Sequence, residues 1–355
     1  MHAPGALTEP LKSITAVQRE GQGNEAASAA WKSVVAAGPA ALPEILAEVG
    51  TGTVVADNWL RLAGDVIVEN AIASGKPLPV GEMEAFLRDT KHSGPARKLA
   101  FDLIRQVDSP KADLLEPSLI QDPVQELRRG AVQRLIDAGK GKSGEEAKAI
   151  YVQALDAVRD EDQTRFLAEE LQKMGVHVDL PAHFGFLMKW HVVGPFDNTG
   201  RKGYETPFPP EREIKLDATY DGKEKPVKWQ EFESKNEYGT VDLNKPLGLL
   251  KEVTGYAVTT FDSPAERDVE LRLGCKNAWK VWVNGQLLFG RDEYHRGQQM
   301  DQYKMKAHLK KGANTILVKC CQDEEKEEWT VEWEFQIRVC DQAGTAVASA
   351  KSDAR

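Results

Sequence analysis

The polar stretch at residues 291–301 carries side chains suited to recognising a polyhydroxylated ligand. Sugar recognition combines planar charged groups, which bind pairs of hydroxyls, with an aromatic face that covers the apolar patch of a sugar ring. Binding residues also concentrate on loops that a rigid scaffold holds in place. The alternative is a solvated polar loop that closes on itself through an internal salt bridge. The candidate ligand-binding residues of this stretch are Arg291, Glu293, Tyr294, His295, Arg296 and Asp301.

Trp282 is the one strand residue that we add to this candidate site. In the strand from Trp279 to Val283, the side chains of Trp279, Val281 and Val283 point one way and that of Trp282 points the other. An exposed tryptophan on a sheet face is a plausible platform for a sugar ring. The alternative is burial, because alternation alone does not tell which face of a sheet is wet.

Residues 323–328, Asp-Glu-Glu-Lys-Glu-Glu, form a dense run of carboxylates. Glycoside hydrolysis uses two carboxylates held about 5–9.5 Å apart across a cleft. Adjacent carboxylates repel one another and stay hydrated, so an exposed hairpin loop explains this run better than an acid/base pair does. The sequence also lacks a Gly-x-Ser-x-Gly motif, a phosphate loop and a dinucleotide fingerprint. We therefore name no catalytic residue.

The elements that would position these side chains are short strands. Asn284-Gly285 predicts a type I′ hairpin turn, because both central residues of that turn need positive φ. Successive short strands without helices between them predict an antiparallel β-sandwich. The core face of the last strand is expected to hold Trp329, Val331, Trp333, Phe335, Ile337 and Val339. The predicted strands are 186–193, 257–261, 269–275, 279–283, 287–289, 304–308, 315–321 and 329–339.

The region from Glu25 to Val178 has the apolar period of helices instead. Sequence segments with a similar pattern begin near Pro95, Asp122 and Asp160, and the aspartates suit helix N-caps. This pattern resembles a degenerate HEAT-type array of stacked helix pairs, and a plain helical bundle is the alternative. The predicted organisation is a flexible lead-in (1–24), a helical domain (25–179), a β-sandwich domain (180–345) and a tail (346–355).

The length, charge and hydropathy of the chain limit which partners and which cellular compartment we expect. The chain has 355 residues and a net charge of −9, which disfavours nucleic acid and anionic membranes as partners. No apolar run is long enough for a transmembrane helix, and the N-terminal residues show no signal peptide. We expect a periplasmic or secreted protein if a signal peptide has been removed, and a cytoplasmic one otherwise.

The four cysteines lie in predicted strands, at positions 275, 320, 321 and 340. They form no Cys-x-x-Cys pair, and no histidine lies at zinc-ligand spacing from them. We expect them to be small apolar strand residues. The alternative is a disulfide that joins Cys275 to Cys320 or Cys321, which would require export to an oxidising compartment.

Residues 184–341 resemble a galactose-binding-like jelly-roll domain, as found in carbohydrate-binding modules and in sugar-binding domains of glycosidases. Its Gly-Pro-Phe opening is similar to accessory domains of exported proteins of planctomycete-type bacteria. The resemblance implies a sandwich fold and a tendency to bind glycans, but no catalysis. It also implies a possible structural calcium, for which Asp197, Glu211 and Asp242 are the candidate ligands. The matching motifs are Trp190-His-Val-Val-Gly-Pro-Phe-Asp, Tyr204-Glu-Thr-Pro-Phe-Pro-Pro-Glu, Lys280-Val-Trp-Val-Asn-Gly and Leu309-Lys-Lys-Gly-Ala-Asn-Thr-Ile-Leu-Val-Lys.

Together these observations predict a non-catalytic binding protein. The sandwich is expected to bind a cell-surface or environmental polysaccharide, and the helical domain is expected to act as a scaffold that contacts a protein partner. One alternative is a structural adaptor whose sandwich contacts only protein. The other is a carbohydrate-active enzyme with a site at the domain junction, near Trp190 and the 291–301 loop. Apart from the possible calcium, we expect no cofactor.

Overall fold

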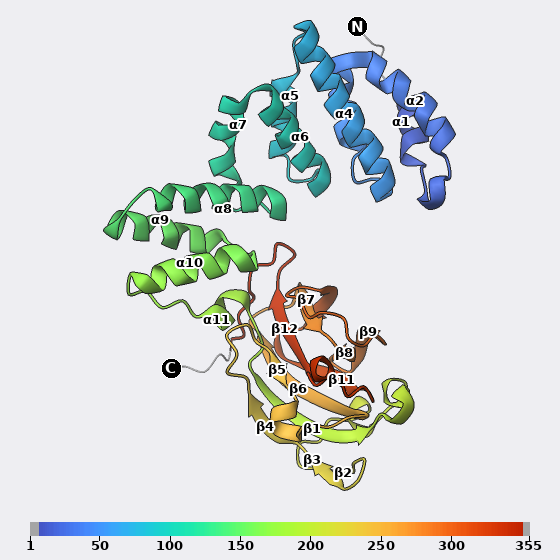
Figure 1. Cartoon of the computed structure of the whole chain (residues 1–355), viewed down its shortest axis with the longest axis vertical. Helices are drawn as coiled ribbons and strands as arrows, with labels where there is room; N and C mark the ends of the chain where they lie inside the picture. Colours follow the sequence, from blue (N-terminus) through green and yellow to red (C-terminus); the bar gives the residue numbers. More distant parts are fainter. Residues whose placement is uncertain (1–6, 351–355) are drawn as a thin grey trace. The chain divides into compact units, whose positions relative to one another are not determined.

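The computed structural model describes residues 7–350, and the chain divides into two compact units, Met1–Asp160 and Glu161–Arg355. The first unit is helical, and the second contains antiparallel sheets that form a sandwich (Figure 1). This confirms the predicted fold class. Helix α10 (Glu161–Lys173) groups with the sandwich, whereas the sequence analysis placed it before the domain boundary.

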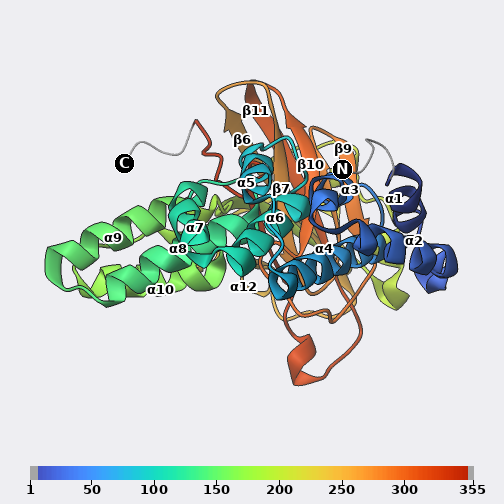
Figure 2. The ribbon, with the colours of Figure 1, turned by 90° about the horizontal axis from the view of Figure 1, so that it is seen from above.

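Neighbouring helices of the first unit pack as pairs, such as α1 with α2, α5 with α6 and α8 with α9. Figure 2 shows α8 and α9 lying side by side. A HEAT-type repeat relationship among these pairs stays a prediction. Among residues 7–350, no helix combines the length and the apolar character needed to cross a bilayer. The helices are α1 (Thr8–Thr15), α2 (Asn24–Ala37), α3 (Leu42–Glu48), α4 (Val54–Ser74), α5 (Val80–Arg88), α6 (Gly94–Val107), α7 (Ser109–Leu115), α8 (Gln125–Lys140) and α9 (Gly144–Ala157).

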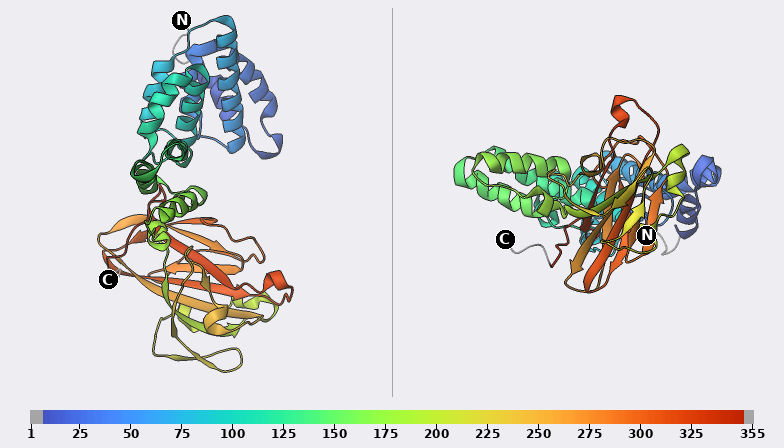
Figure 3. Two further views of the ribbon diagram at one scale, coloured as in Figure 1. Left: turned by 60° about the vertical axis from the view of Figure 1, so that its left-hand side comes forward. Right: turned by 90° about the horizontal axis from the view of Figure 1, so that it is seen from below.

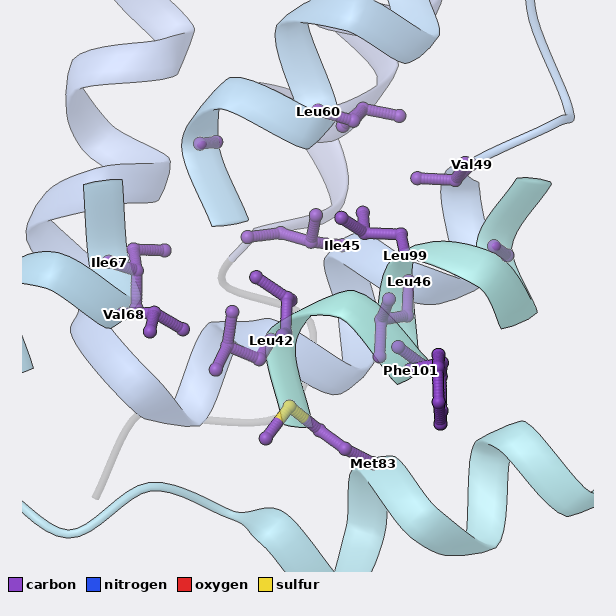
Figure 4. Packing of buried hydrophobic residues seen from close by; sticks show 14 of the residues in the cluster. Leu42, Ile45, Leu46, Val49, Leu60, Ile67, Val68, Met83, Leu99 and Phe101 are labelled. Carbon is purple, nitrogen blue, oxygen red and sulfur yellow. The ribbon is translucent and has the colours of Figure 1, made fainter. Parts of the chain in front are cut away.

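One apolar core runs through the first seven helices and reaches α8, and Figure 4 shows its centre. It extends into α1, where Leu11 and Ile14 are buried, so ordered helix begins inside the predicted lead-in. Helix α4 starts where the Thr53 hydroxyl accepts a hydrogen bond from the backbone N–H of Ala56 (3.2 Å). The side chains drawn in the close-up include Leu42, Ile45, Leu46, Val49, Leu60, Ile67, Val68, Met83, Leu99 and Phe101.

A buried ion pair ties α6 to the start of α8. The Arg97 guanidinium donates to both carboxylate oxygens of Asp122, at 2.8 and 2.5 Å, and to the Leu87 carbonyl at 2.8 Å. The Arg128 guanidinium donates to the Asp122 carbonyl at 2.6 Å. The sequence predicted Asp122 to be a helix N-cap. In the structure its carboxylate is instead the partner of the buried Arg97, because a buried charge needs a partner. Helix α8 begins later, at Gln125.

The second unit contains two larger sheets, which pack face to face (Figure 3). The six-stranded sheet has the order β4-β1-β6-β11-β8-β9, the four-stranded sheet the order β10-β7-β12-β5, and β2 pairs with β3. Two further short helices are α11 (Leu180–Phe184) and α12 (Asn244–Leu247). The strands are β1 (Lys189–Asp197), β2 (Thr219–Asp221), β3 (Pro226–Lys228), β4 (Gln230–Glu233), β5 (Val241–Asp242), β6 (Val253–Ser263), β7 (Arg267–Cys275), β8 (Ala278–Val283), β9 (Gln286–Arg291), β10 (Tyr303–Leu309), β11 (Gly312–Gln322) and β12 (Glu334–Cys340).

Two asparagines set the turns at one end of the six-stranded sheet. Asn284 and Gly285 have φ of 51° and 80°, which confirms the predicted hairpin turn between β8 and β9. The Asn314 side chain closes the turn before β11, accepting from the Lys310 N–H and donating to the Lys310 and Gly312 carbonyls. The Asn284 amide group donates to the Asn314 side-chain oxygen at 2.9 Å. The two turn motifs recognised in the sequence are therefore bonded to each other.

The core of the sandwich lies between the two sheets, and its largest side chains are those of Trp190, Trp279 and Trp333. The prediction that Trp333, Phe335, Ile337 and Val339 share a buried face is confirmed. The same prediction is wrong for Trp329 and Val331, which are 63% and 40% exposed. The strand starts only at Glu334, and a 3₁₀ turn, Glu328–Thr330, precedes it, so strand alternation does not apply there.

The outer face of the six-stranded sheet carries a second, smaller core. Lys319 on β11 is fully buried there, and its ammonium group donates to the carbonyls of Tyr204 and Thr206 and to Glu211, at 3.0, 2.9 and 2.8 Å. The Tyr256 hydroxyl donates to the same Glu211 oxygen. Burial lowers the pKa of Lys319 and raises that of Tyr256. These bonds hold the segment after β1 against the sheet.

Replacing Trp333 by alanine is expected to destabilise the sandwich by about 3–5 kcal/mol, because it opens a large cavity in the core. It also removes the indole N–H bond to the Cys320 carbonyl (3.0 Å). The matched control is Trp329→Ala, four residues earlier, which should change the free energy of unfolding by less than about 0.5 kcal/mol. The measurement is a urea titration of the full chain followed by circular dichroism. Equal shifts for both variants would contradict this assignment.

Candidate functional site

Three connections meet at one end of the sandwich and bring the candidate residues together. They are the 3₁₀ segment Thr199–Tyr204 after β1, the predicted loop 291–301 between β9 and β10, and the link from β11 to β12. Figure 2 shows the β11–β12 link, with its short helical turn, projecting beyond the sheets. We call Arg201, Tyr294, His295, Asp323 and Trp329 the loop-end site.

His295 and Asp323 form the centre of the loop-end site. The His295 Nε2 atom lies 2.7 Å from the Asp323 Oδ2 atom, and the aspartate is fully buried. The Arg201 Nη2 group donates to the same oxygen at 3.1 Å. His295 has a φ of 57°, a left-handed conformation that costs free energy for a residue with a side chain. The bond to Asp323 holds the imidazole in place despite this strain.

Arg201 connects the three segments. Its guanidinium makes a two-pronged ion pair with Glu324, at 3.0 and 2.8 Å, and lies 5.0 Å from the centre of the Tyr294 ring. The hydrogen bonds that Arg201 donates to the Glu324 carboxylate raise the pKa of the guanidinium. The Tyr294 hydroxyl accepts from the Asn198 amide at 3.1 Å, and burial raises its pKa, so it stays neutral. The planar groups of the site are therefore held before any ligand arrives.

Trp329 presents an aromatic surface beside this cluster. Its indole is 63% exposed and meets the His295 ring edge-on, with 5.0 Å between ring centres. The turn that carries it is fixed, because the Thr330 hydroxyl donates to the Glu325 and Glu327 carbonyls at 2.9 and 2.7 Å. The Lys251 ammonium also donates to the Thr330 carbonyl at 2.8 Å. An exposed indole on an anchored turn can stack on an apolar ring face.

The other charged candidates of the predicted loop contact residues of the loop itself or of the strands that flank it. Glu293 forms an ion pair with Arg296 at 3.6 Å and accepts from the Tyr303 hydroxyl at 3.5 Å. The exposed Arg291 guanidinium lies over the Phe289 ring, 4.9 Å from its centre. The internal salt bridge that we considered as the alternative to ligand contact is therefore present. A ligand role for these three charged residues stays a prediction.

Asp301 turns into the protein at the end of the loop. Its carboxylate accepts from the Arg338 guanidinium at 2.6 and 2.7 Å and from Arg272 at 2.7 Å. Burial opposes ionisation of Asp301, but the hydrogen bonds and charges of Arg338 and Arg272 outweigh it and lower the pKa of the carboxyl group. Both carboxylate oxygens are occupied, so the geometry favours an anchoring role over ligand contact.

Trp282 lies on the outer face of its sheet, as its alternation predicts, but it is only 7% exposed. It belongs to the smaller apolar core with Trp229 and Leu317, beneath the segment that Lys319 holds. One edge of it lines a shallow cavity of about 310 Å³, together with Glu211. The geometry gives Trp282 little surface for a sugar ring, so it would act at most at the margin of a ligand.

The candidate calcium ligands lie in three different places. Asp197 accepts from the Thr199 hydroxyl (2.6 Å) and pairs with Lys223, while Glu211 pairs with the buried Lys319. Asp242, on the other sheet, accepts from the Asn244 N–H at 3.0 Å. Within residues 7–350, no group of three or more histidine, cysteine or acidic side chains is arranged to hold a metal ion. A structural calcium stays a prediction.

Sequence reasoning missed four residues of this end of the sandwich: Asn198, Arg201, Asp323 and Trp329. Asp323 was treated as part of an exposed carboxylate run, yet only the residues after it are exposed. The available signal was that Asp323 directly follows the apolar strand β11, which ends at the buried Gln322. Nothing local in the sequence relates Arg201 to a loop about a hundred residues away.

A separate groove of about 800 Å³ crosses the outer face of the six-stranded sheet. Its floor combines hydroxyl groups of β6 and β11 with His191 on β1, and the loop residues Ile214 and Leu216 form part of its wall. His191 lies 3.9 Å from Glu231 on the neighbouring strand β4. The groove includes none of the loop-end residues, so the two features are distinct.

No protein-family model matches this chain, and no curated protein matches it. Among solved structures, a family 35 carbohydrate-binding module from an environmental isolate is 15% identical over 26% of this chain and 70% of that module, with a TM-score of 0.19. A β-glucosidase from Kluyveromyces marxianus is 13% identical over 42% of this chain and 16% of the enzyme, with a TM-score of 0.26. Its glucose complex is 11% identical over 69% of this chain and 33% of the enzyme, with a TM-score of 0.27. At these scores the similarity adds no argument about the ligand of this chain.

Asp301→Asn is expected to destabilise the sandwich by about 3 kcal/mol at pH 7, because buried Arg338 loses its carboxylate partner and buried Arg272 keeps only Glu270. The folded-state pKa of Asp301 is lowered, so its contribution is full above the unfolded pKa, about pH 4, and is lost as the pH falls through the folded pKa. Urea titrations from pH 7 down to pH 3 should therefore show the gap between wild type and variant closing only at the acid end.

The control is Glu293→Gln, which removes a loop carboxylate whose partner Arg296 is 66% exposed. Such an exposed ion pair contributes less than about 1 kcal/mol, so this variant should unfold almost as the wild type does. An Asp301→Asn variant as stable as the wild type at pH 7 would mean that the arginines do not depend on this carboxylate.

Proposed function

We propose that the sandwich binds a polysaccharide through the loop-end site, without catalysis. The observation that carries this proposal is the exposed Trp329 indole, fixed on an anchored turn beside His295 and the Arg201–Glu324 ion pair. A sugar ring stacks its apolar face on an indole and offers its hydroxyls to planar charged groups. The loop-end site places both kinds of group side by side.

The pre-formed state of this cluster supports a binding role. Hydrogen bonds fix Arg201, Tyr294 and His295 in the free protein, so a ligand would not have to order them. Trp329 is the most accessible aromatic side chain of the cluster, whereas the Asp323 carboxylate is fully buried. The ligand would therefore contact the indole, the imidazole edge and the outer side of the Arg201–Glu324 pair.

Binding is favoured over hydrolysis by the state of the central carboxylate. Asp323 is buried and already bonded to His295 and Arg201, so it is poorly placed to donate a proton to a glycosidic oxygen. The exposed carboxylates near it include Glu324, which is committed to Arg201. We propose that these groups orient the ligand. A polysaccharide ligand would also fit an extracytoplasmic location.

Trp329→Ala is expected to weaken binding of the full chain to a retained polysaccharide at least tenfold, since a central aromatic contact contributes about 2 kcal/mol. The measurement is affinity gel electrophoresis across a panel of soluble plant, algal and bacterial polysaccharides. His295→Ala should weaken the same interaction, and thermal unfolding would verify that both variants stay folded.

The matched control is Leu287→Ala, which removes a 54% exposed apolar side chain near the β8–β9 turn. This variant should migrate as the wild type does. Unchanged binding by Trp329→Ala would remove the loop-end site as the contact. Failure of the wild type to bind any polysaccharide in the panel would favour the alternative of a structural adaptor that contacts only protein.

A further inference from the structure

Two cysteines from opposite sheets meet in the core of the sandwich. Cys275 ends β7 in the four-stranded sheet, and Cys320 lies on β11 in the six-stranded sheet. Their Sγ atoms are 3.8 Å apart, and both side chains are buried. The sulfurs are in van der Waals contact across the space between the sheets.

The two other cysteines lack such a contact. Cys321 follows Cys320 directly and therefore points to the opposite face of β11, where its sulfur accepts from the Thr254 hydroxyl at 3.4 Å. The Cys340 sulfur lies 3.7 Å from the Glu270 carbonyl oxygen. All four thiols are free in this structure. Of the adjacent residues Cys320 and Cys321, only Cys320 therefore has its sulfur in contact with another cysteine.

We infer that Cys275 and Cys320 are a cross-linking site, which forms a disulfide between the two sheets when the chain folds with a low-molecular-weight disulfide as oxidant. A covalent bond needs the sulfurs at about 2 Å, and they are already in van der Waals contact, so the bond requires them to approach by about 2 Å more. The sequence alone left Cys320 and Cys321 as equal partners for Cys275. The facing sheets select Cys320.

The chemistry is two thiol–disulfide exchanges. One protein thiolate attacks a sulfur of the small disulfide, which forms a mixed disulfide and releases one small thiolate. The second protein thiolate then attacks the protein sulfur of that mixed disulfide, which forms the Cys275–Cys320 bond and releases the second small thiolate. The two protons of the cysteines pass to the two small thiolates, so the protein pair is oxidised and the small disulfide is reduced to two thiols.

The core position sets when this reaction takes place. Burial raises the pKa of the Cys320 thiol well above its usual value, so little thiolate exists in the folded core. Exchange is therefore slow in the native protein and fast while the chain is still open. The bond would form during folding and would then be protected by the same burial.

The bond would also act on the loop-end site. The two cysteines are 45 residues apart, and the enclosed segment contains β8, β9, β10 and the 291–301 loop. A cross-link at the base of this segment restricts the unfolded chain and so favours the folded sandwich. The strands β9 and β10, which carry the loop, would then gain stability with the rest of the sandwich.

The test is refolding of the full chain from denaturant in mixtures of oxidised and reduced glutathione. Free thiols are then alkylated, and peptides are mapped by mass spectrometry without reduction. The expected result is a Cys275–Cys320 peptide pair and a midpoint of thermal unfolding roughly 5–10 °C above that of the reduced protein. Cys320→Ser should lose both effects, whereas Cys321→Ser, one residue away, should keep both.

Full alkylation of all four cysteines at every glutathione ratio would overturn the inference. So would cross-links that use Cys321 or Cys340 in place of Cys320. The peptide map of the wild-type chain decides between these outcomes by itself, so the result does not depend on the folding of either serine variant. It is also independent of polysaccharide binding, which is measured separately.

Discussion

The buried cluster of Asp301 with Arg272 and Arg338 is the interaction on which the candidate site depends. One carboxylate joins two neighbouring strands of the four-stranded sheet and ends the loop that carries Tyr294 and His295. The Arg338 guanidinium also donates to the carbonyls of residues before β1 and after β12, at 3.0 Å each. A buried charge must find its counter-charge, so this cluster fixes where the loop returns to the sheet. The loop-end residues are held in place from this point.

A second buried cation shapes the opposite face of the sandwich. Lys319 holds the segment after β1 against the six-stranded sheet, and that cover buries Trp282. The same segment begins with Arg201, which reaches the loop-end site. The segment after β1 therefore covers Trp282 and also contributes Arg201 to the site that contains Trp329. The position at which Lys319 anchors this segment therefore decides that Trp282 is covered.

The architecture followed from local patterns. Alternation located the strands from β7 to β11 to within a few residues, and Asn284-Gly285 identified its turn, because period and positive φ are properties of a few adjacent residues. The pattern failed at Trp329, where apolar residues happen to alternate outside a strand. It also misplaced the role of Asp122, which pairs with Arg97 from another helix. Both predictions were wrong because the local alternation of apolar residues carries no information about tertiary contacts.

The sequence by itself determined the fold class, the hairpin, the core faces of most strands and the loop that presents His295. Only the tertiary structure decided which of those residues act together. Asp323 bonds His295 from 28 residues away along the chain, Arg201 bonds Asp323 from 122 residues away, and the Cys320 thiol meets that of Cys275 between the two sheets. Such pairings depend on sheet order and on which buried charges find partners, and neither is encoded in local spacing. That is why the same tryptophan pattern yields a buried Trp282 and an exposed Trp329.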